Sequence, residues 1–361
     1  RNMPQRPAKA IKQVCQYSEQ DGRGHPEEVN TFYANLLLIP AFFKPIPGGL
    51  SDWLRPRGIG RRPMIVLIYI LWCAAILAAA GSRSRSSFFV CYAAIALCNG
   101  SAEAILDGTS VELMQELDLS GAEVQSTAFA FKTAGSMVAV AATDLILAAF
   151  SNHYIALRVC ALVPAAAIPI CMCASFPILP AVRISSGFSG FCSRGAIFGA
   201  IFLFIRGAVP TEGDTFFSFI STKVSGVWVG VRNTASNLGG FLALVSFQAL
   251  PHSVKKNQRL TILTTTSLAV VVGGGIRFCL AVKDFRSFPW VYALCAAAIG
   301  AVDSLSFLPN LAICADCSPK EFGALGFAVL SLVMDLGDQV SSRLAAALTE
   351  AFHLGTDKDR S

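Results

Sequence analysis

Three polar side chains recur at every fourth residue within an apolar stretch of this chain. Asn99, Glu103 and Asp107 share one face if the stretch LCNGSAEAILDGT is helical. Lys132 and Arg206 lie in or beside two other apolar stretches. A charged side chain at the centre of a bilayer costs about 2.5–3.5 kcal/mol. Each of these residues is therefore expected to face a polar cavity, an oppositely charged partner or lipid headgroups, and all five are candidate binding residues.

Acidic residues also interrupt the apolar stretches in the second half of the chain. Asp335 and Asp338 stand three residues apart, so a helix would place both on one face, and Asp303 lies in the preceding apolar stretch. Two neighbouring carboxylates can share a proton, which makes the three residues candidates for ion or proton coupling. A structural role in lining a water-filled cavity explains them equally well.

The composition indicates which elements position these residues. The chain has 361 residues, of which 54% are hydrophobic and 14% are charged, whereas soluble domains carry about 25% charged residues. The apolar stretches are long and apolar on all sides, and about 20 apolar residues cross the hydrocarbon core as a helix. Because backbone polar groups must be satisfied within each span, we predict an all-α, multi-pass membrane protein.

About ten membrane spans are expected from hydropathy. They lie near residues 30–50, 64–81, 88–108, 126–150, 154–181, 194–210, 224–250, 260–282, 288–312 and 323–351. Similar layouts recur in the two halves of the chain, which is typical of transporters built from repeats. The predicted division is a polar N-terminal segment 1–26, an N-terminal helical bundle 27–182, a central cytoplasmic loop 183–194, a C-terminal helical bundle 195–352 and a polar tail 353–361.

A dense basic turn separates the first two spans. In GGLSDWLRPRGIGRRP, Arg55, Arg57, Arg61 and Arg62 accompany a single aspartate, Asp52. Short loops rich in arginine remain on the cytoplasmic side of a membrane. The turn is therefore predicted to be cytoplasmic.

The same turn resembles the signature loop of the major facilitator superfamily. GGLSD is followed by GRRP, but seven residues, rather than the usual two, separate the aspartate from the next glycine. This longer form, preceded by Lys44 and Pro45, resembles the folate–biopterin transporter family. AEAILDGTSVELMQE is similar to that family's acidic motif, with Asp107 and Glu112 in place, and VQSTAFAFKTAGS is similar to a third motif, with Lys132 near an expected arginine.

The resemblance implies a major-facilitator-type transporter with two bundles and twelve helices, of which the ten spans correspond to helices two to eleven. It also implies that the loop bridges helices on the cytoplasmic face and holds one state of an alternating-access cycle. Asp52, Arg61 and Arg62 are the expected gating residues, because a carboxylate and guanidinium groups form directional pairs. The alternative is that the arginines only set topology and contact lipid headgroups.

The resemblance implies folates, biopterin or related pterins as the transported solute. Glu103 or Asp107 can accept the adjacent N–H donors of a pterin, and Lys132 or Arg206 can hold the carboxylate tail of folate. Alternatively, one of these carboxylates pairs with Lys132 only to join two helices. Two further alternatives are open: the same fold moving another organic solute, and a degenerate paralogue that transports nothing.

Other kinds of chemistry find little support in the sequence. The four histidines lie far apart, without the spacing of metal ligands, and the twelve cysteines are scattered mostly through the spans. The net charge of +6 comes from basic residues that flank the spans, which favours anionic headgroups over nucleic acid as partners. We expect a lipid bilayer as the environment, a monomer by default, and no enzyme activity, cofactor or metal. The sequence does not indicate which membrane the protein occupies.

Overall fold

The computed structural model describes most of the predicted spans. The described residues are 42–57, 59–82, 84–117, 119–150, 153–174, 191, 193–208, 226–250, 271–272, 276, 289–319 and 322–351. Nothing is described for most of the predicted spans 30–50 and 260–282, so these two predictions lie largely outside the described residues. The other eight predicted spans each coincide with helix.

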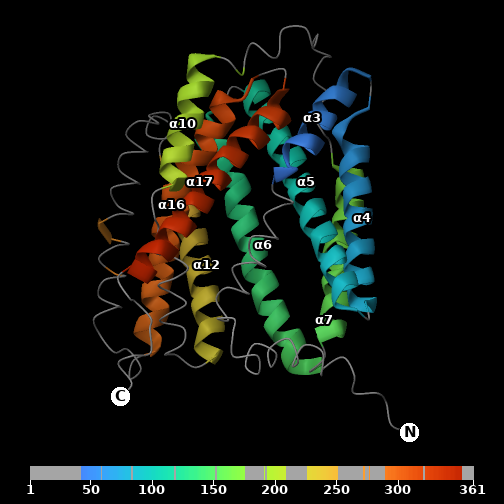
Figure 1. The fold of residues 1–361 in the computed structure, drawn as a ribbon, viewed down its shortest axis with the longest axis vertical. Helices are drawn as coiled ribbons and strands as arrows, with labels where there is room; N and C mark the ends of the chain where they lie inside the picture. Colours follow the sequence, from blue (N-terminus) through green and yellow to red (C-terminus); the bar gives the residue numbers. More distant parts are fainter. Residues whose placement is uncertain are drawn as a thin grey trace. The chain divides into compact units, whose positions relative to one another are not determined.

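The regular elements of the described residues are helical throughout (Figure 1). In chain order they are α3 (Pro45–Leu54), the 3-10 turn η1 (Arg55–Arg57), α4 (Arg61–Gly81), α5 (Arg85–Leu117), α6 (Gly121–Phe150), α7 (His153–Cys160), α8 (Leu162–Cys173), α10 (Arg194–Ala208), α12 (Gly226–Gln248), α16 (Pro289–Cys317) and α17 (Gly323–Ala351). The predicted all-α class is confirmed. Two helices extend beyond the predicted spans, since α5 continues to Leu117 and α16 to Cys317.

Local sequence signals explain where several helices begin. Ser120 and Glu123 form a capping box at the start of α6, in which the Glu123 N–H donates to the Ser120 hydroxyl over 3.4 Å and the Ser120 N–H donates back to the Glu123 carboxylate over 3.4 Å. Ser84 accepts from the Ser87 N–H ahead of α5, and Ser193 accepts from the Ala196 N–H ahead of α10. These caps satisfy N–H groups that have no partner within their own helix.

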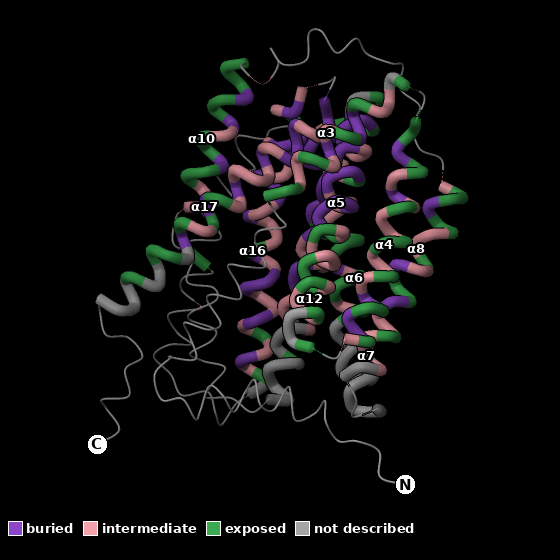
Figure 2. Tube along the Cα trace, turned by 45° about the vertical axis from the view of Figure 1, so that its right-hand side comes forward, coloured by how far each residue is buried: buried purple, intermediate pink, exposed green. Residues whose placement is uncertain are grey.

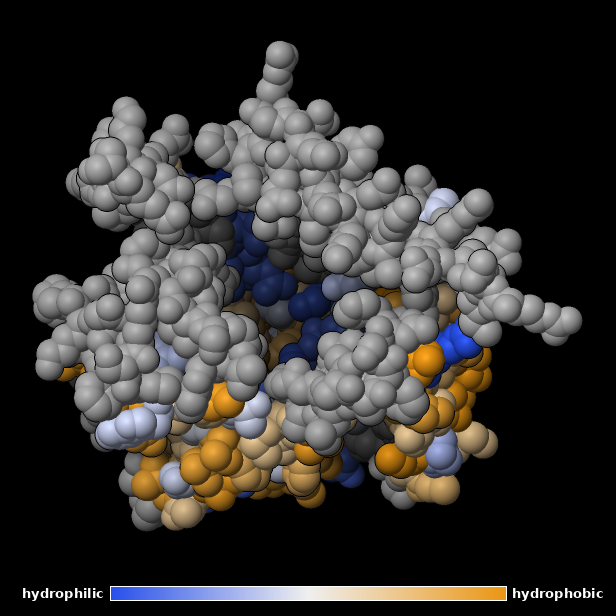
Figure 3. Space-filling view, turned by 90° about the horizontal axis from the view of Figure 1, so that it is seen from below, coloured by the Kyte–Doolittle hydropathy of each residue, from blue (hydrophilic) through white to orange (hydrophobic). Residues whose placement is uncertain are grey.

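The surface of the described residues differs from that of a soluble protein. Large apolar side chains are exposed along α4 and α10, for example Leu67 at 56% and Phe198 at 68%, while Asp52, Arg61 and Glu112 are buried. Figure 2 shows exposed positions along α4 and α10, and Figure 3 shows apolar residues dominating the described surface on its face. Contiguous apolar surface of this kind faces lipid.

Four described helical segments are long and apolar enough to cross a membrane by length and composition: Arg61–Gly81, Ser87–Met114, Trp290–Cys317 and Gly323–Ser341. The α7–α8 pair adds a shorter apolar segment, Leu157–Cys173. The predicted multi-pass membrane protein is therefore confirmed. Its α5 helix has 33 residues, or about 50 Å at 1.5 Å per residue, so it extends beyond a hydrocarbon core of about 30 Å.

Contacts between Cα atoms group the chain into two compact units. The first contains Arg1–Lys44, Arg62–Glu103 and His153–Ala174, and the second contains Pro45–Arg61, Ala104–Asn152 and Ser175–Ser361. Within the second unit, α6 packs on α12 and α16, and α17 packs on α3 and α10. The second unit thus includes helices from both halves of the chain. The bundle boundaries expected from the sequence stay a prediction.

Glycines bring the backbones of α12 and α16 into direct contact. A Cβ atom on Gly239 would overlap the carbonyl oxygen of Ala297, and one on Gly300 would overlap the carbonyl oxygen of Ser236. Small residues of this kind allow the close helix approach on which packing in membranes depends. Gly135 on α6 offers a contrast, since a Cβ atom there meets nothing within 4 Å.

Alanine at Gly239 or Gly300 should therefore destabilise the protein, because α12 and α16 must separate to admit one methyl group. We expect a loss of about 1–3 kcal/mol, the usual cost of overpacking. The matched control, Gly135→Ala, makes the same change in an open helical position and should be neutral or stabilising. Thermal unfolding of the purified variants measures the difference, and equal melting temperatures for all three would contradict the packing.

Candidate functional site

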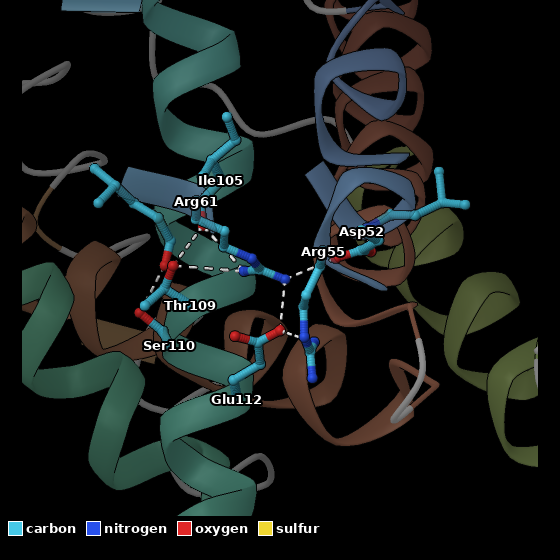
Figure 4. Close-up of polar contacts among 9 residues, drawn as sticks. Asp52, Arg55, Arg61, Ile105, Thr109, Ser110 and Glu112 are labelled. Carbon is cyan, nitrogen blue, oxygen red and sulfur yellow. Dashed lines mark hydrogen bonds and ion pairs between the residues drawn. The ribbon is translucent and has the colours of Figure 1, made fainter. Parts of the chain in front are cut away.

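The basic turn and its aspartate form a buried ionic cluster. Asp52, Arg55, Arg61 and Glu112, called the latch below, come from α3, η1, the first residue of α4 and the last third of α5. The side chains of Asp52, Arg61 and Glu112 are 0%, 4% and 2% exposed. Figure 4 shows Arg61 reaching between the two carboxylates, with Arg55 directed at Glu112.

Arg61 is the centre of the latch. Its Nη2 donates to Asp52 Oδ1 over 2.7 Å and to Glu112 Oε1 over 2.7 Å. Its Nη1 donates to the Ile105 carbonyl over 3.3 Å and to Thr109 Oγ1 over 3.4 Å. The fixed, planar fork of a guanidinium suits this task, because it can serve several acceptors in one plane. A single side chain thereby joins α3 and α5 at the start of α4.

Asp52 also caps a helix from the other half of the chain. Its Oδ2 accepts the backbone N–H of Leu325 over 2.9 Å, and Leu325 lies in the first turn of α17. The N–H groups of a first turn have no partner within the helix, and the helix dipole favours a negative charge there. Burial raises the pKa of the Asp52 carboxyl, and the Arg61 guanidinium, the Leu325 N–H and Arg55 oppose that rise.

Close backbone packing makes room for the latch. A Cβ atom on Gly108 of α5 would overlap Ala324 and lie 2.5 Å from Nη1 of Arg61, and one on Gly48 of α3 would lie 2.9 Å from the Ala324 carbonyl oxygen. The first turn of α17 is therefore held against two glycines, one on α3 and one on α5. Any side chain at Gly108 would displace both the arginine and the helix that Asp52 caps.

The structure brings together part of the predicted gate. Asp52 and Arg61 are paired as expected. Arg62 instead donates to the carbonyl of Ala174, just after α8, and Arg55 pairs with Glu112. Glu112 was identified through the acidic motif but was not assigned to the gate, and Arg55 was read only as a topology signal. Arg57 stays outside the cluster, stacked 3.5 Å from the ring centroid of Trp53.

The candidate binding residues on α5 differ in exposure. Asn99 is exposed, whereas Glu103 and Asp107 are half-buried. Glu103 forms an ion pair with Lys44, whose Nζ lies 3.5 Å from Glu103 Oε2. In the sequence, Lys44 is identified only as a residue that precedes the signature loop, so its ion pair with Glu103 was not predicted.

The remaining candidates lie on α6, α10, α16 and α17. Lys132 is exposed on α6, and Asp303 is exposed on α16. Arg206 on α10 is half-buried, and both it and Asp335 act electrostatically on Asp338 of α17. Beside these residues, the backbones of Gly207 and Gly337 are in contact, which brings α10 against α17. The structure thus joins one predicted binding residue to two predicted coupling residues. No group of three or more His, Cys, Asp or Glu residues suited to a metal occurs in the described part of the chain.

Removing one latch carboxylate should destabilise the protein, because two buried arginines would then share the other. We expect Glu112→Gln to cost about 3–5 kcal/mol, the usual cost of breaking a buried ion pair from one side. The matched control is Glu116→Gln, one turn later on α5, where the glutamate is exposed and the cost should stay within about 0.5 kcal/mol. Melting temperatures of the purified variants test this, and equal values would mean that the latch contributes nothing to stability.

Comparisons with known proteins agree with this geometry. Residues 25–175 match the model of the BT1 family. The fold is similar to that of the E. coli fucose:proton symporter FucP, with a TM-score of 0.61 and 15% identity over 89% of this chain and 85% of that chain. It is also similar to that of the human organic anion transporter MFSD10 (TETRAN), with a TM-score of 0.62 and 14% identity over 95% of this chain and 84% of that chain. No curated protein sequence matches.

These matches confirm the resemblance carried by the signature loop and the acidic motif, both of which fall within the matched residues. Residues 25–175 are therefore similar to the BT1 family, and the fold of the chain is similar to that of the solved membrane transporters.

Proposed function

We propose that this protein transports folates, biopterin or related pterins across a membrane by alternating access. The observation that carries the proposal is the latch, which ties α3 and α5 to the first turn of α17 through Asp52, Arg61 and Glu112. The family match of residues 25–175 supports the solute class. The same fold moving another organic solute is the alternative that the experiments below separate.

The latch suits a conformational gate because it joins helices that the sequence assigns to different bundles. Asp52 makes its capping bond to α17 only while α3 lies against that helix. Opening this end of the protein would break that bond and expose the buried ion pairs to water, where they are solvated individually. The capping bond to Leu325 exists only in the closed state, so it contributes to the free-energy difference between the closed and open states that a gate needs. The arginine-rich turn places this end of the protein on the cytoplasmic side.

The binding chemistry is proposed to lie on α5 and the helices that share its polar face. The carboxylate of Glu103 or Asp107 accepts the adjacent N–H donors of the pterin, and Lys132 or Arg206 holds the anionic tail of folate. Asn99 supplies a further polar contact one turn before Glu103. Charged side chains within apolar helices are costly unless they serve a polar site, which supports this assignment.

Proton coupling is proposed for the acidic residues of α16 and α17. Arg206 and Asp335 act on Asp338 across the α10–α17 contact. A carboxylate next to both a like and an opposite charge can gain or lose a proton when the balance of those charges changes. An anionic substrate that binds Arg206 would alter that balance. Asp303 is the further candidate on α16.

Neutralising Asp52 should shift the protein toward the state in which the latch is open. Asp52→Asn keeps the volume but weakens both the bond to Arg61 and the cap on α17. A cysteine at Val111, which is fully buried and faces Gly323 of α17, should then react with a maleimide faster, by about tenfold or more, if about 1.4 kcal/mol of the difference between states is lost. The other cysteines are replaced first, so that only this position reacts.

The control for this labelling experiment is Glu116→Gln, which alters an exposed carboxylate on the same helix. It should leave the labelling rate of Val111→Cys unchanged. An unaltered labelling rate in Asp52→Asn would mean that the loop does not act as a gate and that its arginines only set the membrane topology.

Substitutions on α5 and α6 test the solute class. Glu103→Gln and Asp107→Asn should each lower pterin affinity about tenfold or more if the residue accepts a charge-assisted hydrogen bond. Lys132→Met should weaken uptake of folate more than that of biopterin, because only folate carries glutamate carboxylates. Competitive uptake of both solutes in cells that express the protein provides the measurement. Normal transport by both carboxylate variants would place the pterin site elsewhere, and equal losses in Lys132→Met would make that lysine a helix-pairing residue.

A further inference from the structure

The Lys44–Glu103 pair is more exposed than the latch. Its side chains are 18% and 27% exposed, whereas those of Asp52, Arg61 and Glu112 are 0–4% exposed. The separation of 3.5 Å between Nζ and Oε2 is also longer than the 2.7 Å bonds at Arg61. An ion pair that is partly open can exchange one partner for a ligand, whereas the sealed latch cannot do so without a change of state.

Lys44 is positioned for this pairing by the elements on either side of it. It precedes Pro45, the first residue of α3, and the backbone of a residue before proline is restricted. Its aliphatic stem crosses α5 at Gly100, where an added Cβ atom would lie 3.3 Å from Lys44 Cγ. Glu103 lies three residues further along α5, so the ammonium reaches the carboxylate on the same face as the glycine.

We propose that Lys44 and Glu103 together recognise the amino-pyrimidinone edge of the pterin ring, an inference that rests on the proposed function. That edge presents two donors, the 2-amino group and N3–H, followed by one acceptor, the 4-oxo group. The two oxygens of Glu103 accept the donors, and the Lys44 ammonium beside them donates to the 4-oxo oxygen. The order acceptor, acceptor, donor on the protein is complementary to the order on the ligand.

This assignment separates the role of Lys44 from that of a residue that holds the tail. The pair lies within 3.5 Å, and the glutamate carboxylates of folate lie at the far end of the molecule from its pterin edge. Lys44 therefore contacts the ring that folate and biopterin share, and it sets the preference for an oxo group over an amino group at position 4. An ammonium opposite a 4-amino group would place two donors against each other, which is repulsive.

Folic acid and its 4-amino analogue, aminopterin, test the inference, because the analogue has an amino group in place of the 4-oxo group assigned to Lys44 and also lacks the N3–H assigned to Glu103. Equilibrium binding of radiolabelled folic acid to the purified full chain in lipid nanodiscs, with aminopterin and biopterin as competitors, gives the three affinities. Wild-type protein should prefer folic acid to aminopterin by about tenfold or more, the effect of one charge-assisted hydrogen bond. Lys44→Met should reduce that preference to the part that the N3–H bond to Glu103 supplies, and it should weaken folic acid and biopterin equally.

Lys44→Arg, which keeps the cation, should retain the preference for the 4-oxo ring, and melting temperatures establish that each variant is folded. Glu103→Gln should weaken all three ligands. If wild-type protein binds folic acid but Lys44→Met leaves the ratio to aminopterin unchanged, the pair only joins elements of the fold and the inference is wrong, while the proposed function stands. If wild-type protein binds neither folic acid nor biopterin, the proposed solute class is wrong and this inference falls with it.

Discussion

A neutral group of four charges, three of them buried, is the constraint on which the described structure depends. Arg55 and Arg61 balance Asp52 and Glu112, so none of the four can be lost without leaving a net charge away from water. The balance explains the length of α5, which must extend far enough to carry Glu112 to the basic turn. It also explains the glycines, because Gly48 and Gly108 let the first turn of α17 approach Asp52 and Arg61. The length of α5 and the close packing at the two glycines thus both follow from the need to pair these charges.

Burial distinguishes the roles of the ionic groups along the chain. Charges that are buried and bonded to several groups, as Arg61 is through Nη1 and Nη2, hold helices together. The Lys44–Glu103 pair is partly exposed, and it is the pair proposed to bind the ligand. Asp338 belongs to a third kind, in which a like charge, Asp335, and an opposite charge, Arg206, act on one carboxylate. The roles proposed for these groups, in gating, recognition and coupling, follow these differences in burial and charge.

The sequence predicted those properties that depend on a single segment. Long apolar stretches are sufficient to assign membrane helices, since the bilayer imposes one thickness on every span. The predicted span near residues 88–108 ends before α5 does. The last two turns of α5 are polar, and hydropathy alone cannot separate a polar helix from a loop. The capping box at Ser120 and Glu123 marks that boundary locally and was a usable signal.

Pairings between distant segments could not be derived in the same way. Four arginines occupy eight positions of one turn, and the choice of Arg55 over Arg62 as the second latch cation is made by the η1 turn and by the place of Glu112, 57 residues away. Lys44 likewise lies far in sequence from Glu103. Gly100 gives no signal of their pairing, because it contributes only the space over which the aliphatic part of the Lys44 side chain lies. The family resemblance identified Glu112 without its partners, because a motif records residues and not their contacts.

The distance between the α5–α6 turn and the start of α10 tests the central claim most directly. Spin labels at the exposed positions Leu119 and Ile197 report whether this end of the protein separates, since Gly121 packs beside Asp316 and the Gly195 carbonyl accepts from Cys317. Pulsed electron–electron double resonance on protein in nanodiscs should give one short distance between the two spin labels when the latch is intact. A second, longer distance should become populated in Asp52→Asn. A single unchanged distance in both proteins would show that the latch does not control an opening at this end.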